Sequence, residues 1–377
     1  MTRIRLLIVA ATALLSACAS LPRPSPPSVA VRVAFDRDRI TGAEGRGAGP
    51  DDPVRIASIS KLITALGVMR LVEAGTLDLD SDVSRWLGWS LRNPNFPDRP
   101  ITLRLLLSHT SSLKDDVDYA IPLGTTLRET LADPKAWDAE HPPGSFFRYG
   151  NINFPVVASV MEAAAGERFD KLMARLVFAP LKIDACFNWT TCSNAAVARA
   201  VTLRDEKGAV RRDDLNGVRP DCPVLSPDPA CDLSRYVLGS NGALFSPQGG
   251  ARISATGLAR IGQMLLKDGD GFLSPASVAL LAGPEWRFDG SNGETENGYY
   301  CRYGLAVHLL ATTGCRDDPF GDEVQRIGHS GDAYGLRSGL WIDRQSGQGI
   351  ANFVTAVPDD APKGRSAFTA AEEALAR

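Results

Sequence analysis

Residues 338–357 read SGLWIDRQSGQGIANFVTAV. The polar, glycine-containing turn RQSGQG (344–349) separates two apolar runs, which is typical of a β-hairpin. Two further runs of strand character precede it, YGLAVHLLA (303–311) and EVQRIGHSG (323–331). The last quarter of the chain is therefore predicted to supply several strands to one antiparallel sheet.

The opposite end of the chain carries another strand signal, because SVAVRVAF (28–35) partly alternates and is rich in β-branched valine. Residues 41–53 are rich in Gly, Asp and Pro and are predicted to form a loop. Residues 182–235 show little periodicity and are predicted to be a loop-rich insertion. Apolar spacing and capping residues predict helices at 59–74 (ending at Gly75), 102–108 (capped by Thr102), 155–165, 255–267 (capped by Ser254) and 367–377.

Strands at both ends and helices between them define the expected fold class. We predict an α+β fold, an α/β sandwich in which an antiparallel sheet is built from both chain ends, is flanked by helices and contains an inserted helical region. Residues 28–377 are expected to form this single domain.

Composition excludes several classes of function. The 377 residues are 44% hydrophobic and 23% charged, as in globular proteins, and the net charge of −3 offers no basic surface for nucleic acid. Histidines occur only at His109, His141, His308 and His329, and no two lie within five residues of each other. A helical zinc pair is therefore absent, and we expect neither a metal nor a cofactor. The first three histidines are expected to be structural.

The first 27 residues have the pattern of a targeting segment. Two arginines precede an apolar run at 6–15 that is too short to span a bilayer, so residues 1–17 are predicted to be a signal peptide. The sequence LSAC (15–18) resembles the lipobox of bacterial lipoproteins, which implies lipidation of Cys18. The alternative is a free cysteine after an ordinary leader. Ala19, in place of Asp, implies an outer-membrane anchor facing the periplasm, and residues 18–27 form a proline-rich spacer.

Six further cysteines fit an oxidising compartment. They form three sequence-adjacent couples, and although fifteen connectivities are possible, local pairing is the simplest expectation. The six are Cys186, Cys192, Cys222, Cys231, Cys301 and Cys315.

The sequence Ser58-x-x-Lys61 begins the strongest predicted helix. Residues three apart share a helix face, so the hydroxyl and the amine can meet. A serine nucleophile needs a nearby base, and a lysine becomes one when burial lowers its pKa. A second copy of the pattern, Ser111-x-x-Lys114, is followed by aspartates and lacks a predicted helix. Taken alone, the first copy also fits a helix cap followed by a surface lysine.

Two later motifs favour the interpretation as a nucleophile and its base over that of a helix cap and a surface lysine. Tyr149-x-Asn151 and His329-x-Gly331 follow Ser58-x-x-Lys61 in that order. Together the three motifs resemble those of the penicillin-recognising serine hydrolases, which include class C β-lactamases, D-Ala-D-Ala carboxypeptidases, D-aminopeptidases and related esterases. The segments 105–111 and 241–246 also resemble connecting segments of this superfamily. The resemblance covers most of residues 28–377 except the cysteine-rich middle.

The resemblance implies a role for each motif. Ser58 would be acylated, Lys61 would help remove its proton, and Tyr149 would act as the partner base through its phenolate. Asn151, His329 and Gly331 would bind substrate. The oxyanion hole would be formed by the backbone N–H groups of Ser58 and Asp332.

The third motif departs from the β-lactamase pattern, in which a lysine occupies the position of His329. Histidine is only partly charged near neutrality, so efficient β-lactam hydrolysis is not expected. The resemblance to carboxypeptidases, D-aminopeptidases and esterases implies a D-amino-acid peptide or small ester instead. Arg337 is either a binder of substrate carboxylate or a surface arginine. Two alternatives stay open: β-lactamase activity, and a non-catalytic lipoprotein that binds a partner with the same fold.

Overall fold

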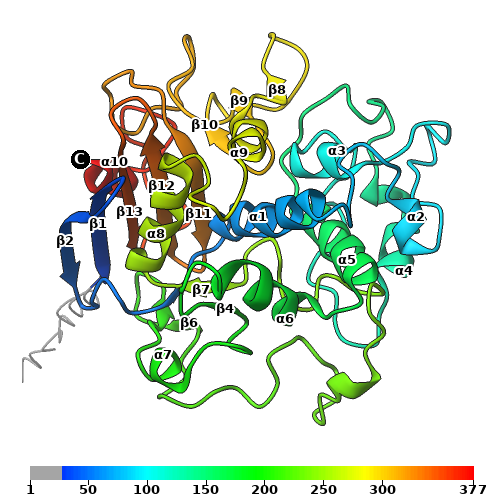
Figure 1. Ribbon diagram of the computed structural model, residues 1–377, viewed down its shortest axis with the longest axis horizontal. Coiled ribbons are helices and arrows are strands. Elements are labelled where there is room, and N and C mark those ends of the chain that lie inside the picture. The colour runs from blue at the N-terminus through cyan, green and yellow to red at the C-terminus, as the bar shows by residue number, and fades with distance from the viewer. Residues whose placement is uncertain (1–27) are drawn as a thin grey trace, which may run out of the picture.

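The computed structural model describes residues 28–377. The predicted signal peptide, the lipidated Cys18 and the spacer of residues 18–27 lie outside the described residues. At one side of the molecule stands an eight-stranded sheet in the order β2-β1-β13-β12-β11-β10-β9-β8, with every neighbouring pair antiparallel (Figure 1). Its strands are β1 (Ala30–Asp36), β2 (Ile40–Arg46), β8 (Trp286–Arg287), β9 (Arg302–Tyr303), β10 (His308–Leu309), β11 (Ile327–Ala333), β12 (Leu336–Asp343) and β13 (Gln348–Val354).

The pairing of β1 with β13, next to the edge strand β2, joins segments from the two ends of the chain. Val33 lies opposite Ala351, and both are fully buried. The predicted fold class, an antiparallel sheet built from both chain ends and flanked by helices, is confirmed. Because side chains alternate between the faces of a strand, the register assigns one face to each of two helices.

Helix α8 (Ala255–Leu266) covers one face of the sheet, and α10 (Ala370–Ala376) packs against the other. Gly262 allows the close approach of α8, since a Cβ there would lie 2.3 Å from the ring of Phe35. On the opposite face, Trp341 and Ile350 form a separate apolar cluster with Phe368. Both faces of the sheet are thereby covered at β12 and β13.

Helix α1 (Ile59–Glu73) runs between this sheet and a second body of helices (Figure 1). Twelve of its fifteen residues are buried, so it is surrounded by protein on nearly every side rather than along one stripe. The other helical segments are α2 (Ser84–Leu87), α3 (Leu103–Leu107), α4 (Leu127–Leu131), η1 (Pro134–Ala136), α5 (Asn153–Ala165), α6 (Phe169–Met173), η2 (Ala174–Phe178), α7 (Asn194–Ala198), η3 (Leu233–Arg235) and α9 (Pro275–Ala282).

The predicted caps are confirmed. The side chain of Thr102 accepts a hydrogen bond from the backbone N–H of Leu105, and Ser254 accepts one from Gly257. These bonds satisfy N–H groups that have no partner in the first turn of a helix. The predicted helix at the C-terminus begins three residues later than expected, after the capping residue Thr369.

Two sequence predictions are wrong. Residues 41–46 are not a loop but most of the edge strand β2, whose seven residues are all exposed. A strand that is solvated on both faces lacks the apolar alternation that reveals a strand in the sequence. The expected single strand at 303–311 is two short strands, β9 and β10, because a turn closed by the hydrogen bond from Gly304 N to Val307 O interrupts it.

The cysteine-rich middle is largely irregular, as predicted, and contributes β4 (Cys186–Phe187) to a small sheet in the order β3-β7-β4. Strands β3 (Val54–Arg55) and β7 (Ala251–Ile253) complete that sheet, and β5 (Leu203–Arg204) pairs with β6 (Val210–Arg212). Local cysteine pairing is confirmed. The disulfides are Cys186–Cys192, Cys222–Cys231 and Cys301–Cys315.

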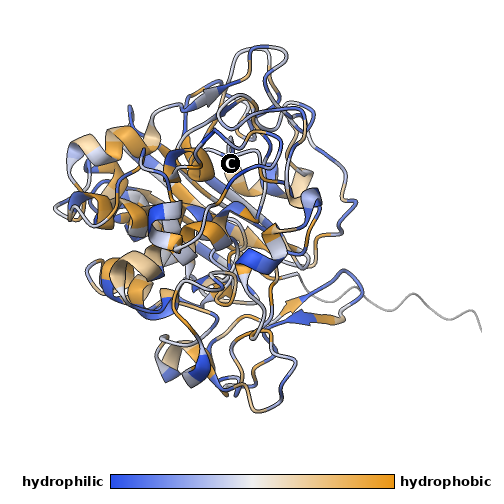
Figure 2. Cartoon of the chain, turned by 90° about the vertical axis from the view of Figure 1, so that its right-hand side faces the viewer, coloured by the Kyte–Doolittle hydropathy of each residue, from blue (hydrophilic) through white to orange (hydrophobic). Residues whose placement is uncertain are grey.

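Hydropathy follows this architecture. Apolar segments concentrate in the packed helices and strands, and polar segments predominate in the peripheral loops (Figure 2). Within residues 28–377, no helix combines the length and the apolar character needed to cross a membrane.

Candidate active site

The candidate nucleophile lies at a sharp bend between β3 and α1. Ala57, immediately before Ser58, has a φ of 51°, a left-handed conformation that costs a non-glycine residue on the order of 1–3 kcal/mol. Ser58 then begins the helix, and its hydroxyl lies 3.0 Å from the Lys61 ammonium nitrogen. The predicted pairing of Ser58 with Lys61 across one helical turn is present.

Lys61 is fully buried and has three hydrogen-bond partners. Besides Ser58 Oγ, its Nζ atom contacts Asn151 Oδ1 at 2.8 Å and the carbonyl oxygen of Gln248 at 3.1 Å. Burial lowers the pKa of Lys61 to about 7, and the nearby Asp115 carboxylate opposes this shift. A substantial fraction of this amine is therefore neutral at physiological pH.

The hydrogen-bond partners of Lys61 also orient its lone pair. A neutral amine has two N–H donors and one lone pair, and the oxygens of Asn151 and Gln248 act only as acceptors. When both accept from Nζ, the lone pair is left for the third partner, the hydroxyl of Ser58. The site is therefore arranged for transfer of the serine proton to lysine.

Asp115 fixes the side-chain amide of Asn151. One carboxylate oxygen of Asp115 accepts from Asn151 Nδ2 at 2.9 Å and from the Asn151 backbone N–H at 2.8 Å, and the other accepts from the N–H of Ile152 at 2.9 Å. With Nδ2 held in this way, Oδ1 faces Lys61. Asn151, expected to bind substrate, is thus in direct contact with the candidate base.

Tyr149 joins the same cluster. Its ring is packed between His109 and Tyr300, with centroid distances of 4.4 and 4.8 Å, and Lys61 Nζ lies 4.8 Å from its centroid. The phenolic oxygen is buried and has no hydrogen-bond partner in the described part of the chain. Burial raises the pKa of Tyr149, and the neighbouring Ser58 hydroxyl lowers it only in part. This environment favours the protonated phenol of Tyr149 over the phenolate.

His329 lies behind the cavity rather than in it. Its side chain is fully buried, with Nδ1 2.6 Å from the Ser330 carbonyl oxygen and Nε2 2.7 Å from the Tyr303 hydroxyl. The carbonyl can only accept, so Nδ1 carries the proton and Nε2 accepts from Tyr303. Burial, and secondarily the charge of Lys61, lowers the pKa of His329 to about 3, so the ring is neutral. The next side chain, Ser330, lines the cavity instead.

Gly331 and Asp332 have different surroundings. A Cβ on Gly331 would lie 2.2 Å from the carbonyl oxygen of Ile56, so glycine allows β11 to pack against the segment that precedes Ser58. Asp332 lines the cavity and forms an ion pair with Arg337. The side chain of Arg337 is only 4% exposed, so the expectation of a surface arginine is wrong.

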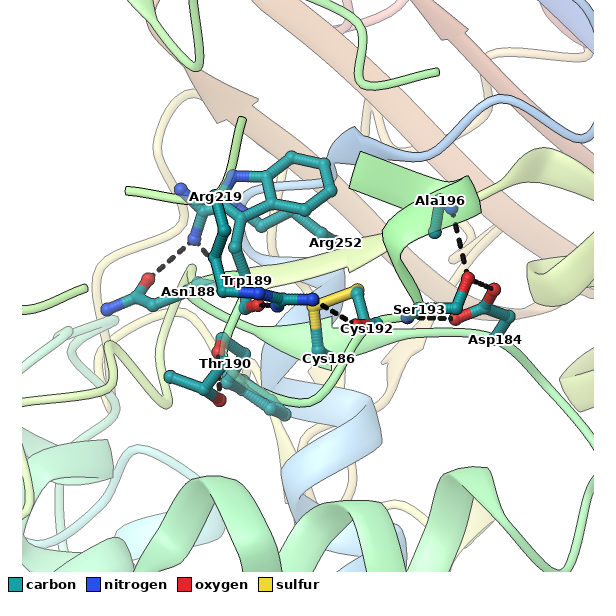
Figure 3. The surroundings of a disulfide bond; sticks show 12 residues. Asp184, Cys186, Asn188, Trp189, Thr190, Cys192, Ser193, Ala196, Arg219 and Arg252 are labelled. Carbon is teal, nitrogen blue, oxygen red and sulfur yellow. Dashed lines mark hydrogen bonds between the residues drawn. A yellow bond between two sulfur atoms is a disulfide. The ribbon is translucent and has the colours of Figure 1, made fainter. Parts of the chain in front are cut away.

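A cavity of about 860 Å³ opens over these groups. Ser58, Tyr149 and Asn151 line it, together with residues of the cysteine-rich insertion. One wall is stabilised by the Cys186–Cys192 disulfide and by Arg219, which donates to the carbonyl oxygen of Cys192 at 2.7 Å (Figure 3). The insertion therefore shapes the space in front of the nucleophile.

The second Ser-x-x-Lys copy has no comparable arrangement. Ser111 donates to Asn153 Oδ1 at 2.5 Å, and the Lys114 ammonium forms an ion pair with Asp116 at 2.6 Å. The other histidines also lie outside the cavity lining. His109 packs behind Tyr149, His141 contacts Asp138 at 2.9 Å, and His308 is buried among aromatic rings.

Several site residues carried no signal in the sequence. Asp115 follows the discarded second motif, Gln248 contributes only its backbone carbonyl, and Arg55 precedes the nucleophile by three residues. Each is recognised only from its contacts, since no spacing rule connects any of them with Ser58.

Comparison with known proteins agrees with this geometry. Residues 24–375 match the family described as Beta-lactamase. The chain belongs to this family of serine hydrolases. Solved structures of the same fold include EstCE1, a hydrolase with promiscuous acyltransferase activity, with a TM-score of 0.68 and 23% identity over 92% of each chain. D-amino acid amidase from Ochrobactrum anthropi SV3 aligns with a TM-score of 0.65 and 18% identity, over 93% of this chain and 91% of that one.

Curated relatives of this β-lactamase-family chain match over shorter stretches. Penicillin-binding protein 4 of Amycolatopsis lactamdurans is 28% identical over 68% of this chain and 65% of its own length. D-alanyl-D-alanine-carboxypeptidase/endopeptidase AmpH of Escherichia coli K12 is 30% identical over 35% of each chain. Protein flp of Staphylococcus aureus N315 is 26% identical over 45% of this chain and 35% of its own. The chain thus spans between about one third and two thirds of these relatives.

Proposed function

We propose that this protein hydrolyses an amide or ester through an acyl-enzyme on Ser58, and that its substrate is a D-amino-acid peptide or a small ester. The observation that carries the proposal is the 3.0 Å contact between Ser58 Oγ and a fully buried Lys61 whose two other partners are acceptors. The similarity to a carboxypeptidase and an amidase supports a D-amino-acid peptide as the substrate, and the similarity to EstCE1 supports a small ester.

In the acylation step, Ser58 Oγ forms a bond to the substrate carbonyl carbon while its proton passes to Lys61 Nζ. The backbone N–H groups of Ser58 and Asp332 stabilise the resulting oxyanion. The bond to the leaving group then breaks as that group takes the phenolic proton of Tyr149, and the Lys61 ammonium supplies the replacement proton. Water repeats the sequence on the acyl-enzyme, which releases the acid and regenerates the Ser58 hydroxyl.

This assignment gives Tyr149 the role of proton donor. The raised pKa of its phenol favours the protonated form, and its unpartnered hydroxyl is available to a leaving group. Lys61, with a pKa of about 7, is better matched to the role of base at neutral pH.

The test is labelling with a fluorophosphonate serine probe, followed by turnover of p-nitrophenyl acetate, a D-Ala-D-Ala peptide and nitrocefin. We expect labelling that Ser58→Ala abolishes, with turnover of the ester or the peptide. Turnover of nitrocefin alone would replace the proposed substrate with a β-lactam. Absence of both labelling and turnover in the folded protein would favour the non-catalytic binding module.

We also propose that Cys18 is lipidated and anchors the enzyme to the bacterial outer membrane, facing the periplasm. The support is the LSAC sequence at 15–18 after a short apolar run. Metabolic labelling with a palmitate analogue should mark the full-length chain and not Cys18→Ser. Equal labelling of the two would contradict the anchor.

A further inference from the structure

One wall of the cavity has an excess of positive charge. This wall has two acidic side chains. One of them, Asp213, is paired with Arg252, which donates hydrogen bonds to it at 2.8 and 3.1 Å. The other acidic side chain, Asp214, forms an ion pair at 3.9 Å with Arg204, a residue that does not line the cavity. The charged residues of this wall are Arg55, Arg211, Arg212, Arg252, Asp213 and Asp214, and the rest of the cavity lining carries Arg337, Lys363, Glu296, Asp332, Asp359 and Glu372.

Arg55 has no anion of its own. Its residue is 9% exposed, its buried Nε atom has no hydrogen-bond partner within residues 28–377, and the charge of Asp213 acts on it without a direct ion pair. Its guanidinium carbon lies 5.1 Å from the centroid of the Tyr334 ring. Arg212, which is exposed, lies 4.8 Å from the same centroid and donates to the Tyr334 hydroxyl at 3.3 Å. A buried cation without an acceptor is costly unless a ligand supplies one.

The surroundings hold this wall in place. Asn188, Trp189 and Asp213 all have positive φ values, between 49° and 67°, and all three are tied into one network with Arg252. Arg252 donates to Asn188 Oδ1 at 2.5 Å (Figure 3). Trp189 Nε1 donates to Asp213 Oδ1 at 3.0 Å. Asp213 hydrogen-bonds Arg252 and Trp189, and it acts on Arg55 through its charge without a hydrogen bond or ion pair.

Arg55 remains a cation at neutral pH. Burial, followed by the neighbouring charge of Arg252, lowers the pKa of Arg55 to about 10, well above neutrality. Its planar guanidinium presents paired N–H donors in the geometry that matches a carboxylate. The residue lies three positions before Ser58, and both line the same cavity.

We propose that Arg55, assisted by Arg212, forms an anion subsite that binds a carboxylate of the substrate while its ester or amide is cleaved at Ser58. The inference rests on the proposed function and specifies the substrate class as acidic. The carboxylate belongs either to the acyl part or to the leaving group, and the two cases need separate substrates.

Two matched pairs of esters test the subsite. On the acyl side, p-nitrophenyl hydrogen glutarate is compared with its neutral methyl ester. On the leaving-group side, 3-acetoxybenzoate is compared with methyl 3-acetoxybenzoate. For at least one pair we expect kcat/KM to favour the anion by about 10- to 100-fold, the range of a hydrogen bond between charged groups. The ratio within a pair does not depend on the fraction of active enzyme.

Arg55→Met should reduce that ratio to near one, and Arg55→Lys should retain part of it because the charge remains without the planar fork. Arg128→Met, on the exposed surface of α4, is the matched control and should keep the wild-type ratio. Arg55→Met should also leave Tm equal or raise it, since a buried charge is removed and the guanidinium loses only its contact with the Tyr334 ring. A lowered Tm with an unchanged ratio would show that Arg55 is structural and overturn the subsite.

Binding is measured separately in the Ser58→Ala background. The glutarate half-ester should bind more tightly than its methyl ester, and Arg55→Met should remove the difference. Neutral esters hydrolysed without any preference for the anion would overturn the subsite and leave the proposed function intact. Selective binding of the anion without turnover or Ser58 labelling would uphold the subsite and overturn the proposed function. Equal binding of both esters would overturn the subsite.

Discussion

The chain contains the pattern Ser-x-x-Lys twice, and the two copies have different fates. At the first copy, α1 places the Lys61 amine 3.0 Å from the Ser58 hydroxyl, inside protein. At the second, the chain is not helical, and the Lys114 ammonium pairs with Asp116 at a partly exposed position. The same residue types thus produce a candidate base in one place and an ordinary ion pair in the other. Burial and helical geometry, rather than the pattern, decide the chemistry.

The largest expected difference between the copies is in turnover. Ser58→Ala should lower kcat by about 10⁶-fold, the loss typical of removing a nucleophilic serine. Ser111→Ala should retain turnover and lose only about 1 kcal/mol of stability with its buried hydrogen bond. Ester hydrolysis and chemical denaturation check the two variants. Equal losses of activity would mean that the copies are not functionally distinct.

Replacement of the lysine in the first copy is expected to have the next largest effect. Lys61→Met should lower kcat/KM by about 10²- to 10⁴-fold, because the general base is lost. Steady-state kinetics on one ester checks this value, and circular dichroism confirms the fold. A loss of less than tenfold in a folded variant would assign the base to another group.

The pH profile tests the environment of Lys61 directly. An amine accepts a proton only in its neutral form, so kcat/KM should be low below the lysine pKa and rise through an apparent pKa of about 7. The measurement is kcat/KM for a neutral ester between pH 5 and pH 9, corrected for spontaneous hydrolysis. A rise in kcat/KM with an apparent pKa near the ordinary pKa of lysine would contradict the assignment of Lys61 as a buried, partly neutral amine.

Asp115 offers a finer test of the same site. Asp115→Asn removes a charge that favours the ammonium form, so the acid limb of the profile should move to lower pH. The variant also weakens the bonds that orient Asn151, and kcat should fall about tenfold while KM changes little. Asp116→Asn is the control, because its partner is Lys114. An unchanged apparent pKa of the acid limb would contradict the electrostatic coupling between Asp115 and Lys61.

The smallest effect is expected at the second lysine. Lys114→Met removes a partly exposed ion pair and should change the free energy of unfolding by less than about 0.5 kcal/mol. Turnover should stay within twofold of wild type. A larger loss of turnover would show that the second copy contributes to the site.

The sequence predicted the sheet, the main helices and the pairing of Ser58 with Lys61 because each of these depends on local periodicity or spacing. The motif order also selected Tyr149 and Asn151, which the fold brings to Lys61 from about ninety residues away. The edge strand β2 was missed, since it has no buried face. The burial of His329 could not be predicted either, because the accessibility of a polar side chain depends on neighbours distant in sequence.

The same reason explains why Arg337 was partly misjudged and why Asp115 and Arg55 were not selected. Charged residues are usually exposed. Arg55 on β3 and Arg337 on β12 are buried, and the half-buried Asp115 lies in the loop between α3 and α4. Spacing rules can identify Ser58 and Lys61, which lie on one helix. The charged residues around them come from separate segments and follow no spacing rule.

The most direct test of the account is to trap the acyl-enzyme and locate it. Wild-type protein, quenched in acid during hydrolysis of a p-nitrophenyl ester, is measured by intact-mass spectrometry and peptide mapping. The account predicts a mass increase equal to one acyl group, carried by the peptide that contains Ser58 and absent from Ser58→Ala. An acyl group on Ser111, or ester turnover that is unaffected by Ser58→Ala, would contradict it.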